Sequence, residues 1–393
     1  MTEVYVVSAM RTAIGGFGGS LKDVPPHELG TTIIKAAIEK AGIAGGDVEH
    51  VVVGHVINTE PRDQYLSRLA SVNAGVPNES VAMNVNRLCG SGLQAIISAA
   101  QSIKLGDADV AVGGGVEVMS RGPYITPALR WGARMGDNKV VDMMTGAVTD
   151  PFEVVHMGVT AENVANQFDI SREDQDALAA ESHRRAINAI QSGYFKEQIA
   201  PVVIKTRRAE IVFDTDEHAR ADVSVESLSK LRPAFVRENG SVTAGNASGL
   251  NDGAAAVVLM SEEGVKKHGA KPLARLVSYA HAGVEARIMG IGPVPASKKA
   301  LEKAGLKIED MDVIEANEAF AAQALAVSRG LGLDPAKVNP NGSGIGLGHP
   351  IGATGAIITT KAIHELQRTG GKYALVTMCI GGGQGIAAIF ERV

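Results

Sequence analysis

An approximate internal repeat limits the fold of this chain to one with two similar halves. The helix-like segment AIEKAG begins at Ala37, and ALEKAG begins 263 residues later, at Ala300. The same offset relates the apolar, strand-like segment HVVVG at 50–54 to VIEAN at 313–317. In each copy a helix is followed by a short acidic loop and then by a strand. One short match could arise by chance, so the elements that follow decide whether the repeat is real.

The order of elements continues in both copies through glycine-rich segments. CGSGLQAII, which begins at Cys89, resembles HPIGATGAII, which begins at His349, and a glycine follows three residues later in both. Each segment leads through a helical stretch to a strand that ends in glycines, at 107–115 and at 373–383. The shared order predicts an α/β protein built from two duplicated βαβ-type halves.

The segment between the halves has a different character. From about Arg121 to Val242 the chain is more charged and less apolar, and Ser171 with Asp174 resembles a capping box at the start of a helix. We expect an inserted region that covers one face of the core, or forms a lid at the mouth of the active site, or does both. The core resumes with NASGLNDGAAAVVLM, whose last residues are typical of a buried strand.

Composition and charge exclude several classes of protein. The net charge is −5 and no basic stripe is present, which disfavours binding to nucleic acid. No apolar run reaches the roughly 18 residues of a membrane span, and the N-terminal residues lack the pattern of a signal peptide. Two cysteines in 393 residues suit a reducing compartment. The C-terminal ERV is not a peroxisomal address, so we expect a cytoplasmic protein.

The first cysteine has the sequence context of a nucleophile. Cys89 follows the strand-like VAMNVN and precedes an apolar helix that ends at Gly106, so its thiol is expected at a helix N-terminus. That position can lower a cysteine pKa from about 8.5 toward the range of about 3.5–7.5. The alternative is that Cys89 is a small buried apolar residue, as free cysteines usually are.

The second cysteine and one histidine extend this pattern. Cys379 ends an apolar strand before three glycines, and by itself it is typical of a core cysteine. We expect Val112 to be its counterpart in the other half, so that only one half carries a thiol there. His349 occupies the position that Cys89 holds in the first half. If a pseudo-twofold axis relates the halves, these two turns can meet and supply a base for the thiol.

Other residues are more ambiguous. Asn317, in EANEAFAAQ, is expected between a strand and a helix, where it is either a helix N-cap or an amide donor to an oxyanion. The chain lacks GxGxxG, Walker A, GxSxG and HExxH motifs. Two isolated cysteines do not make a zinc site, and we expect no metal site.

Four motifs together resemble those of a known family. CGSG, NEAF, GHPIGATG and CIGGGQG, in this order and at these spacings, resemble the thiolases, which are acetyl-CoA acetyltransferases and β-ketothiolases. The resemblance runs from VVSAMRTAIGGFGGSL near the N-terminus to the last strand. The chain is most similar to bacterial biosynthetic-type β-ketothiolases that act on short 3-ketoacyl-CoA. Related synthases with a Cys-His-His or Cys-His-Asn site lack the second cysteine.

The resemblance implies a fold and an organisation. The expected fold is the layered αβαβα thiolase fold, in which two halves related by a pseudo-twofold axis carry an inserted loop domain. The implied N-terminal half is 1–120, completed by 250–270, and the implied C-terminal half is 271–393. Between them, 121–249 is expected to be a loop domain that covers the CoA site. The family also implies a homotetramer, built as a dimer of dimers.

The resemblance further implies an activity. Acetyl-CoA and an acyl-CoA would condense reversibly to a 3-ketoacyl-CoA (acetoacetyl-CoA, and also 3-ketovaleryl-CoA) and CoA, through a ping-pong acyl-cysteine mechanism. Cys89 would be the acylated nucleophile, His349 would take its proton, and Cys379 would remove the α-proton of the second substrate. One thioester oxygen would be held by His349 and a water on Asn317, the other by the N–H groups of Cys89 and Gly381. No cofactor is expected to be bound permanently, since CoA thioesters are the substrates.

The family also implies contacts to CoA and a pocket with local departures. Residues at positions near the pantetheine or adenine of CoA are His156, Met157, Arg220, Ser227, Ala244, Ser248, Met289 and Phe320. Apolar residues beside the motifs that we expect to line the acyl pocket are Leu88, Met157, Met289 and Met378. The chain has Thr354 where many relatives have serine, and Gly342-Ser343-Gly344 where many have Gly-Gly-Ala. Both departures lie beside His349 and affect the expected pocket shape.

Two other interpretations stay open at this point. A related synthase with a carrier-protein substrate would need a basic docking patch, and the sequence contains none that can be recognised. A thiol redox sensor, in which Cys89 and Cys379 pair, would leave the glycine turns and His349 unexplained.

Overall fold

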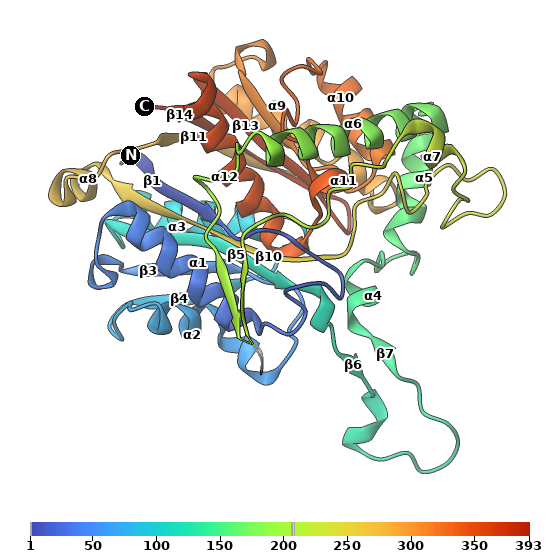
Figure 1. Ribbon diagram of the computed structural model, residues 1–393, viewed down its shortest axis with the longest axis horizontal. Helices are drawn as coiled ribbons and strands as arrows, with labels where there is room; N and C mark the ends of the chain where they lie inside the picture. Colours follow the sequence, from blue (N-terminus) through green and yellow to red (C-terminus); the bar gives the residue numbers. More distant parts are fainter. Residues whose placement is uncertain (1, 206, 208) are drawn as a thin grey trace.

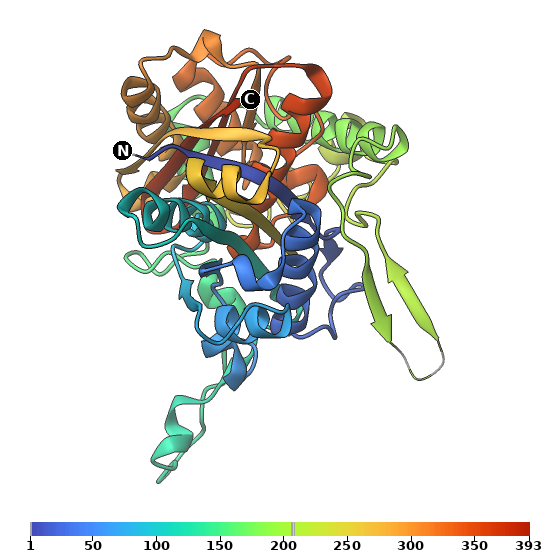
Figure 2. The ribbon, with the colours of Figure 1, turned by 90° about the vertical axis from the view of Figure 1, so that its left-hand side faces the viewer.

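The structure is a computed structural model that describes residues 2–205, 207 and 209–393. Its main strands form one mixed sheet in the order β12-β13-β14-β11-β1-β10-β5-β3-β4. Strand pairing is sparse in the middle of this sheet, because β1 and β11 pair at only two positions, Tyr5 with Arg275 and Val6 with Ala274. The sheet therefore divides there into two parts, and Figure 2 shows the first in blue and teal with β10 in yellow, and the second in orange to red.

Each part of the sheet contains strands from one half of the chain. The N-terminal part comprises β4 (Val81–Val85), β3 (His50–Gly54), β5 (Val110–Val118), β10 (Asn251–Ser261) and β1 (Val4–Arg11), with β2 (Gly15–Gly16) paired to β10. The C-terminal part comprises β12 (Val313–Ala316), β13 (Tyr373–Ile380), β14 (Gln384–Arg392) and β11 (Ala274–Gly283).

The pairing pattern of the strands confirms the duplication. In one part β3 is parallel to β5, and β10 and β1 follow in antiparallel pairs. In the other part β12 is parallel to β13, and β14 and β11 follow in antiparallel pairs. A single parallel bridge from Ile314 to Val338 takes the place of β4. The two halves are therefore the same unit repeated.

The strand register corrects one detail of the repeat. Val51 pairs with Val112 in the first half, and Ile314 pairs with Leu375 in the second. The counterpart of Val112 is therefore Leu375, and the prediction that it is Cys379 was wrong. At the same offset of 263 residues the counterpart of Cys379 is Val116. The first glycine run, 113–115, lies within β5, whereas the second, 381–383, follows β13, and matching the two runs misplaced the cysteine by four residues.

Helices form three layers around the strands (Figure 1). In the middle, α3 (Ser91–Leu105) and α12 (Ile351–Thr369) pack on each other, and α12 contacts strands of both halves. The outer helices of the N-terminal half are α1 (Pro26–Ala41), α2 (Leu66–Asn73) and α8 (Glu262–His268). Those of the C-terminal half are α9 (Pro293–Ala304) and α10 (Ala321–Leu331). The layers agree with the predicted αβαβα arrangement.

The segment between β5 and β10 packs against both halves. Its elements are β6 (Tyr124–Ile125), β7 (Val141–Asp142), α4 (Met143–Ala147), α5 (Met157–Gln167), α6 (Arg172–Gln191), β8 (Val202–Lys205), β9 (Glu210–Phe213) and α7 (Val225–Ser229). Helices α5 and α6 contact α10, whereas Val202 and Phe213 of the β8–β9 hairpin join the apolar cluster beneath α1. The arm with β6 and β7 extends away from the body (Figure 1). A division into three domains at 120 and 249 stays a prediction.

The remaining elements are short. Helix α11 (Gly344–Leu347) precedes α12, and the 3-10 helices are η1 (Gly45–Asp47), η2 (Pro61–Tyr65), η3 (Met119–Arg121), η4 (Pro127–Arg130), η5 (Ala286–Ile291) and η6 (Ile308–Asp310). Within the described residues, no helix combines the length and the apolar character needed to cross a membrane.

The close crossing of α3 and α12 predicts a sensitive position. A Cβ atom on Gly92 would lie 2.7 Å from the backbone nitrogen of Ala356, and backbone cannot move aside cheaply. We expect Gly92→Ala to lower the free energy of unfolding by about 1–3 kcal/mol, measured from the urea midpoint. Gly46→Ala is the matched control, because a Cβ there would have open space. Equal midpoints for the two variants would contradict the role of this crossing.

Candidate active site

A cavity of about 360 Å³ lies where the catalytic turns predicted from the sequence meet. Cys89, His349, Cys379 and Gly381 all line it, so the structure brings both thiols and the imidazole to one place. Cys89 lies just before α3, His349 just before α12, and Cys379 at the end of β13. The pseudo-symmetric middle helices therefore position two of the three groups.

The predicted CoA contacts divide into two groups. Those that line the cavity are His156, Met157, Ala244, Ser248, Met289 and Phe320. Arg220 and Ser227 do not line it and are exposed at the surface. Arg220 pairs with Asp222 at 3.3 Å. Their roles toward CoA stay predictions.

The turn that carries Cys89 is held by one serine. The Ser91 hydroxyl accepts the N–H of Arg87 at 2.8 Å and donates to the Leu88 carbonyl at 2.6 Å. Leu88 has a φ of 45°, in the left-handed region that residues with a side chain rarely adopt. The strained residue directly before Cys89 fixes where the thiol points.

The charge state of Cys89 differs from the expectation. Burial raises the pKa of its thiol to about 11, although the N–H groups of Gly381 and of Cys89 itself point at the sulfur and lower the pKa in part. The prediction of a lowered pKa was therefore wrong, because loss of solvation outweighs the helix N-terminus. Cys89 is half-buried at the cavity wall and carries its proton at neutral pH. It needs a base to react.

His349 is a neutral imidazole. Burial lowers its pKa to about 4. Its Nδ1 lies 2.7 Å from Thr354 Oγ1, and the Thr354 hydroxyl donates its proton to the Pro350 carbonyl at 2.9 Å. Since that hydroxyl can then only accept from the ring, Nδ1 carries the imidazole proton and Nε2 has the free lone pair. His349 is therefore in the tautomer that can take a proton at Nε2.

Asn317 supports His349. Its Nδ2 lies 3.4 Å from His349 Nε2, and its backbone N–H donates to the Thr377 carbonyl at 3.0 Å. Its buried Oδ1 has no hydrogen-bond partner among the described residues. Asn317 does not line the cavity itself. The sequence placed it correctly after a strand, and a role in holding a water stays a prediction.

Cys379 is the more buried of the two thiols. It lies at the end of β13 opposite Gly385 of β14. Burial, and secondly its proximity to Cys89, raise the pKa of its thiol above the ordinary range. Both cysteines are free. At neutral pH the site therefore contains two protonated thiols and one neutral imidazole.

Two buried side chains that hold the His349 turn were missed in the sequence. Asn251 Oδ1 accepts the backbone N–H of His349 at 2.9 Å. Glu117 accepts the N–H of Gly352 at 2.9 Å, at the first turn of α12, and burial raises the pKa of its carboxyl group. A lone acid in the apolar strand VAVGGGVEV could have drawn attention to Glu117, because buried carboxylates need partners.

The rest of the cavity wall is apolar and adaptable. His156 stacks on Phe235 with ring centroids 4.6 Å apart, and Phe235 meets the edge of Phe320. Four flexible methionines also line the cavity: Met119, Met144, Met157 and Met289. Leu88 lines it as predicted, but Met378 does not, because alternation along β13 turns its side chain into the core.

Comparisons with known proteins agree with one another. Residues 4–263 match the family model for the thiolase N-terminal domain, and 270–392 match that for the thiolase C-terminal domain. The chain is 68% identical over 391 residues to beta-ketothiolase BktB of Cupriavidus necator, covering 100% of this chain and 99% of that protein. It is 51% identical over 394 residues to acetyl-CoA acetyltransferase of Pseudomonas aeruginosa, with 100% of both covered.

Solved structures give the same result. The crystal structure of the Bacillus anthracis acetyl-CoA acetyltransferase is similar with a TM-score of 0.98 at 49% identity, covering 100% of this chain and 99% of that chain. The crystal structure of human mitochondrial 3-ketoacyl-CoA thiolase in complex with CoA is similar with a TM-score of 0.97 at 45% identity, covering 100% of this chain and 98% of that chain.

The charge state of the thiols gives a prediction that needs no substrate. With a Cys89 pKa of about 11, its rate of alkylation by iodoacetamide should rise about tenfold per pH unit from pH 7 to 10, because only the thiolate reacts. A free thiol such as glutathione, the control, should level off above about pH 9. Peptide mass spectrometry at each pH gives the rate for Cys89 alone. A plateau below pH 8 would mean that the thiolate is stabilised after all.

Proposed function

The chain belongs to the thiolase family, and we propose how its residues carry out the family's reaction. The protein is an acyl-CoA:acetyl-CoA C-acyltransferase, which condenses acetyl-CoA reversibly with an acyl-CoA to give a 3-ketoacyl-CoA and CoA. The observation that carries the assignment of roles is that Cys89, His349 and Cys379 line one cavity.

The first half-reaction forms an acyl-enzyme. The Cys89 sulfur attacks the thioester carbonyl of the acyl-CoA while His349 Nε2 takes the thiol proton, which the free lone pair on Nε2 supports. The carbon–sulfur bond to CoA breaks, and the departing CoA sulfur takes the proton of Cys379. This step leaves acyl-Cys89, a protonated His349 and a Cys379 thiolate. The two opposite charges form together, so the buried cavity gains no net charge.

The second half-reaction forms the carbon–carbon bond. The Cys379 thiolate removes the α-proton of acetyl-CoA, and the resulting carbanion attacks the carbonyl carbon of acyl-Cys89. The bond from that carbon to sulfur breaks, and the Cys89 sulfur recovers its proton from His349. All three groups return to the neutral state in which burial holds them.

Hydrogen-bond donors would stabilise the negative oxygen in each step. We propose that the N–H groups of Cys89 and Gly381 hold one thioester oxygen, since both already point at the Cys89 sulfur. A protonated His349, with a water on Asn317, would hold the other. Removing one such donor in other enzymes costs about 2.7–4 kcal/mol of transition-state stabilisation.

The apolar part of the cavity is proposed to hold the pantetheine arm and the acyl group. His156, Met157, Ala244, Ser248, Met289 and Phe320 line it and match the predicted CoA positions. Arg220 and Ser227 are exposed and do not line the cavity. We propose that they meet the nucleotide of CoA, because a guanidinium and a hydroxyl suit phosphates. CoA thioesters enter as substrates.

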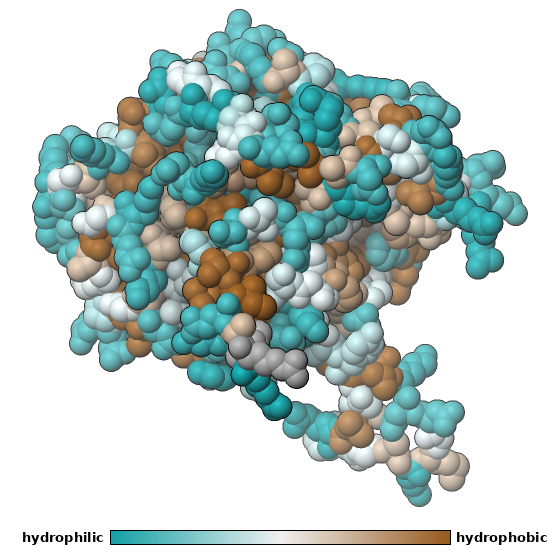
Figure 3. Space-filling model, in the orientation of Figure 1, coloured by the Kyte–Doolittle hydropathy of each residue, from teal (hydrophilic) through white to brown (hydrophobic). Residues whose placement is uncertain are grey.

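We propose that the protein forms a homotetramer in the cytoplasm. Strand β4 is the edge of the described sheet, and Val81 and Met83 on it are 58% and 41% exposed. Unpaired, apolar edge strands favour pairing with another chain. The arm with β6 and β7 carries exposed apolar side chains, which include Trp131 and Met135. Figure 3 shows brown, hydrophobic residues on this arm. A reducing compartment would keep both thiols free.

Substitution should separate the roles of the two thiols in acylation and in condensation. We expect Cys379→Ala to keep the acylation of Cys89 by acetyl-CoA at close to one group per chain, but to lower the rate of condensation by at least about 10²–10⁴-fold, the usual contribution of a general base. Intact mass after acid quenching measures acylation, and 3-ketoacyl-CoA absorbance measures condensation. Met378→Leu is the matched control, a buried neighbour outside the cavity. Full condensation activity in Cys379→Ala would require another base.

The methionine-lined wall predicts a broad substrate range. One methylene in an apolar pocket is worth about 1–3 kcal/mol, or about 10–200-fold, and methionines can repack around it. We therefore expect 3-ketovaleryl-CoA to be cleaved at a rate comparable to acetoacetyl-CoA, measured as kcat/KM for thiolysis with CoA. A preference for acetoacetyl-CoA beyond about 200-fold would show a pocket closed at four carbons.

A further inference from the structure

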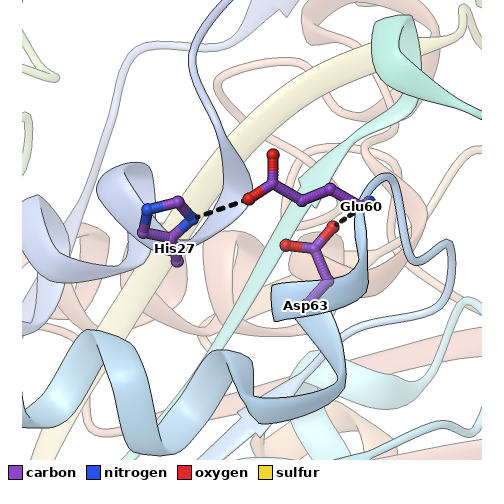
Figure 4. A group of neighbouring side chains, drawn as sticks. All are labelled: His27, Glu60 and Asp63. Carbon is purple, nitrogen blue, oxygen red and sulfur yellow. Dashed lines mark hydrogen bonds and ion pairs between the residues drawn. The ribbon is translucent and has the colours of Figure 1, made fainter.

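A second cluster of polar side chains lies in the N-terminal half, apart from the cavity. His27 is in the first turn of α1, and Glu60 and Asp63 are at the start of η2. One nitrogen or oxygen from each lies within 4.8 Å of the others, and Figure 4 shows both carboxylates facing the imidazole. His27 and Asp63 are buried and Glu60 is half-buried. None of the three lines the active-site cavity.

Three buried polar atoms around this cluster have no hydrogen-bond partner among the described residues. They are His27 Nδ1, Asp63 Oδ1 and His55 Nε2. The three side chains are 6%, 0% and 1% exposed. His55 Nε2 is 4.0 Å from Asp63 Oδ2, so it belongs to the same cluster. Each unsatisfied buried group costs about 1–3 kcal/mol, so several together call for a ligand.

The hydrogen bonds around the cluster show that two of these atoms, His55 Nε2 and Asp63 Oδ1, are acceptors. His55 Nδ1 is 2.9 Å from the Val116 carbonyl, which can only accept, so Nδ1 carries the proton and Nε2 is left with a lone pair. Asp63 Oδ2 already accepts the N–H and hydroxyl of Thr59, which leaves Oδ1 free. A carboxylate oxygen can only accept. The lone pairs of His55 Nε2 and Asp63 Oδ1 therefore have no hydrogen-bond donor among the described residues.

The second oxygen of Glu60 is also oriented by a partner. Its Oε2 pairs with Arg121 at 3.2 Å, and its Oε1 lies 3.5 Å from His27 Nδ1. In metal sites, a contact to the atom of a ligand side chain that does not bind the metal holds that side chain in orientation. His55, Asp63 and Glu60 thus each have one atom that faces the cluster and a second atom that the protein holds.

We propose that His27, His55, Glu60 and Asp63 form a binding site for a divalent transition-metal ion of the zinc class. Two imidazoles with two carboxylates suit Zn²⁺, whereas Ca²⁺ and Mg²⁺ prefer oxygen ligands alone. Ligands at about 2.0–2.2 Å from zinc lie roughly 3–3.6 Å apart in a tetrahedron. The His27–Glu60 distance already fits, the ligand atoms of His27, Glu60 and Asp63 have to contract modestly from within 4.8 Å of one another, and His55 has to move toward them.

Ion binding would join separate parts of the N-terminal half. It would connect α1 with η2 and with the residue that follows β3. The expectation of no metal site arose because cysteines were the ligands considered. These four ligands come from two histidines and two acids spread over three segments, and no short motif contains them.

The active site is a competing zinc site, since two thiols and an imidazole meet there. The experiment therefore starts from protein treated with chelator and then with iodoacetamide to block both thiols. Equilibrium dialysis against Zn²⁺ with elemental analysis should give one ion per chain. The thermal midpoint should also rise with Zn²⁺ concentration, because the ion binds only the folded chain.

Variants locate the ion. We expect His27→Gln and Glu60→Gln each to weaken Zn²⁺ binding by at least about 100-fold, as loss of a ligand should exceed the effect of an outer contact. His268→Gln is the matched control, because His268 and Asp47 form an isolated pair at 3.9 Å. It should leave binding unchanged.

Cobalt keeps the test decisive if a variant fails to fold. Wild-type protein with blocked thiols and Co²⁺ should show visible bands of a site with nitrogen and oxygen ligands, and no thiolate charge-transfer band. No ion bound to the blocked protein would overturn the proposal and assign a water to the cluster. Unchanged Zn²⁺ binding in both ligand variants would overturn it too, because the ion would then lie elsewhere.

Discussion

The close packing of α3 against α12 is the contact on which the active site depends. Each helix begins two residues after a side chain that we propose to be catalytic, Cys89 in one half and His349 in the other. Gly92 and Gly355 occupy the crossing, and a Cβ atom on either would meet backbone of the partner helix. Glycine therefore lets the two helix starts approach, and that approach brings a thiol and an imidazole to the same cavity.

Desolvation sets the chemistry once these groups have met. Burial raises the pKa of both thiols and lowers that of His349, so the site at rest contains no charge on its three reacting groups. A stored thiolate is not the source of reactivity. In the proposed mechanism the ion pair forms when CoA departs, and it disappears when the new carbon–carbon bond forms. The tautomer of His349, fixed by Thr354, prepares the acceptor for the first proton.

The sequence predicted the fold well because duplication repeats whole elements in order. Strand types, middle helices and the meeting of Cys89, His349 and Cys379 all followed from it. It predicted charge states poorly, since the pKa of Cys89 depends on solvation from segments far along the chain.

The sequence motifs also did not predict contacts between residues that are far apart in the chain. Glu117 and Asn251 hold the His349 turn from strands of the other half, far from His349 in the sequence. Met378 was expected in the pocket because it adjoins Cys379, yet side chains alternate along a strand. The cluster of His27 with Glu60 and Asp63 depends on how α1 meets η2, which no local pattern contains.

The central claim is that both thiols are protonated at rest and that acylation of Cys89 turns Cys379 into a thiolate. Infrared S–H stretching measures this directly, because the chain has only two cysteines. The resting protein should show an S–H band from each of the two cysteines, and the Cys379→Ser variant assigns each band to its residue. After acetylation by acetyl-CoA and removal of CoA, the account predicts that both bands disappear. An S–H band that persists in fully acetylated protein would contradict it.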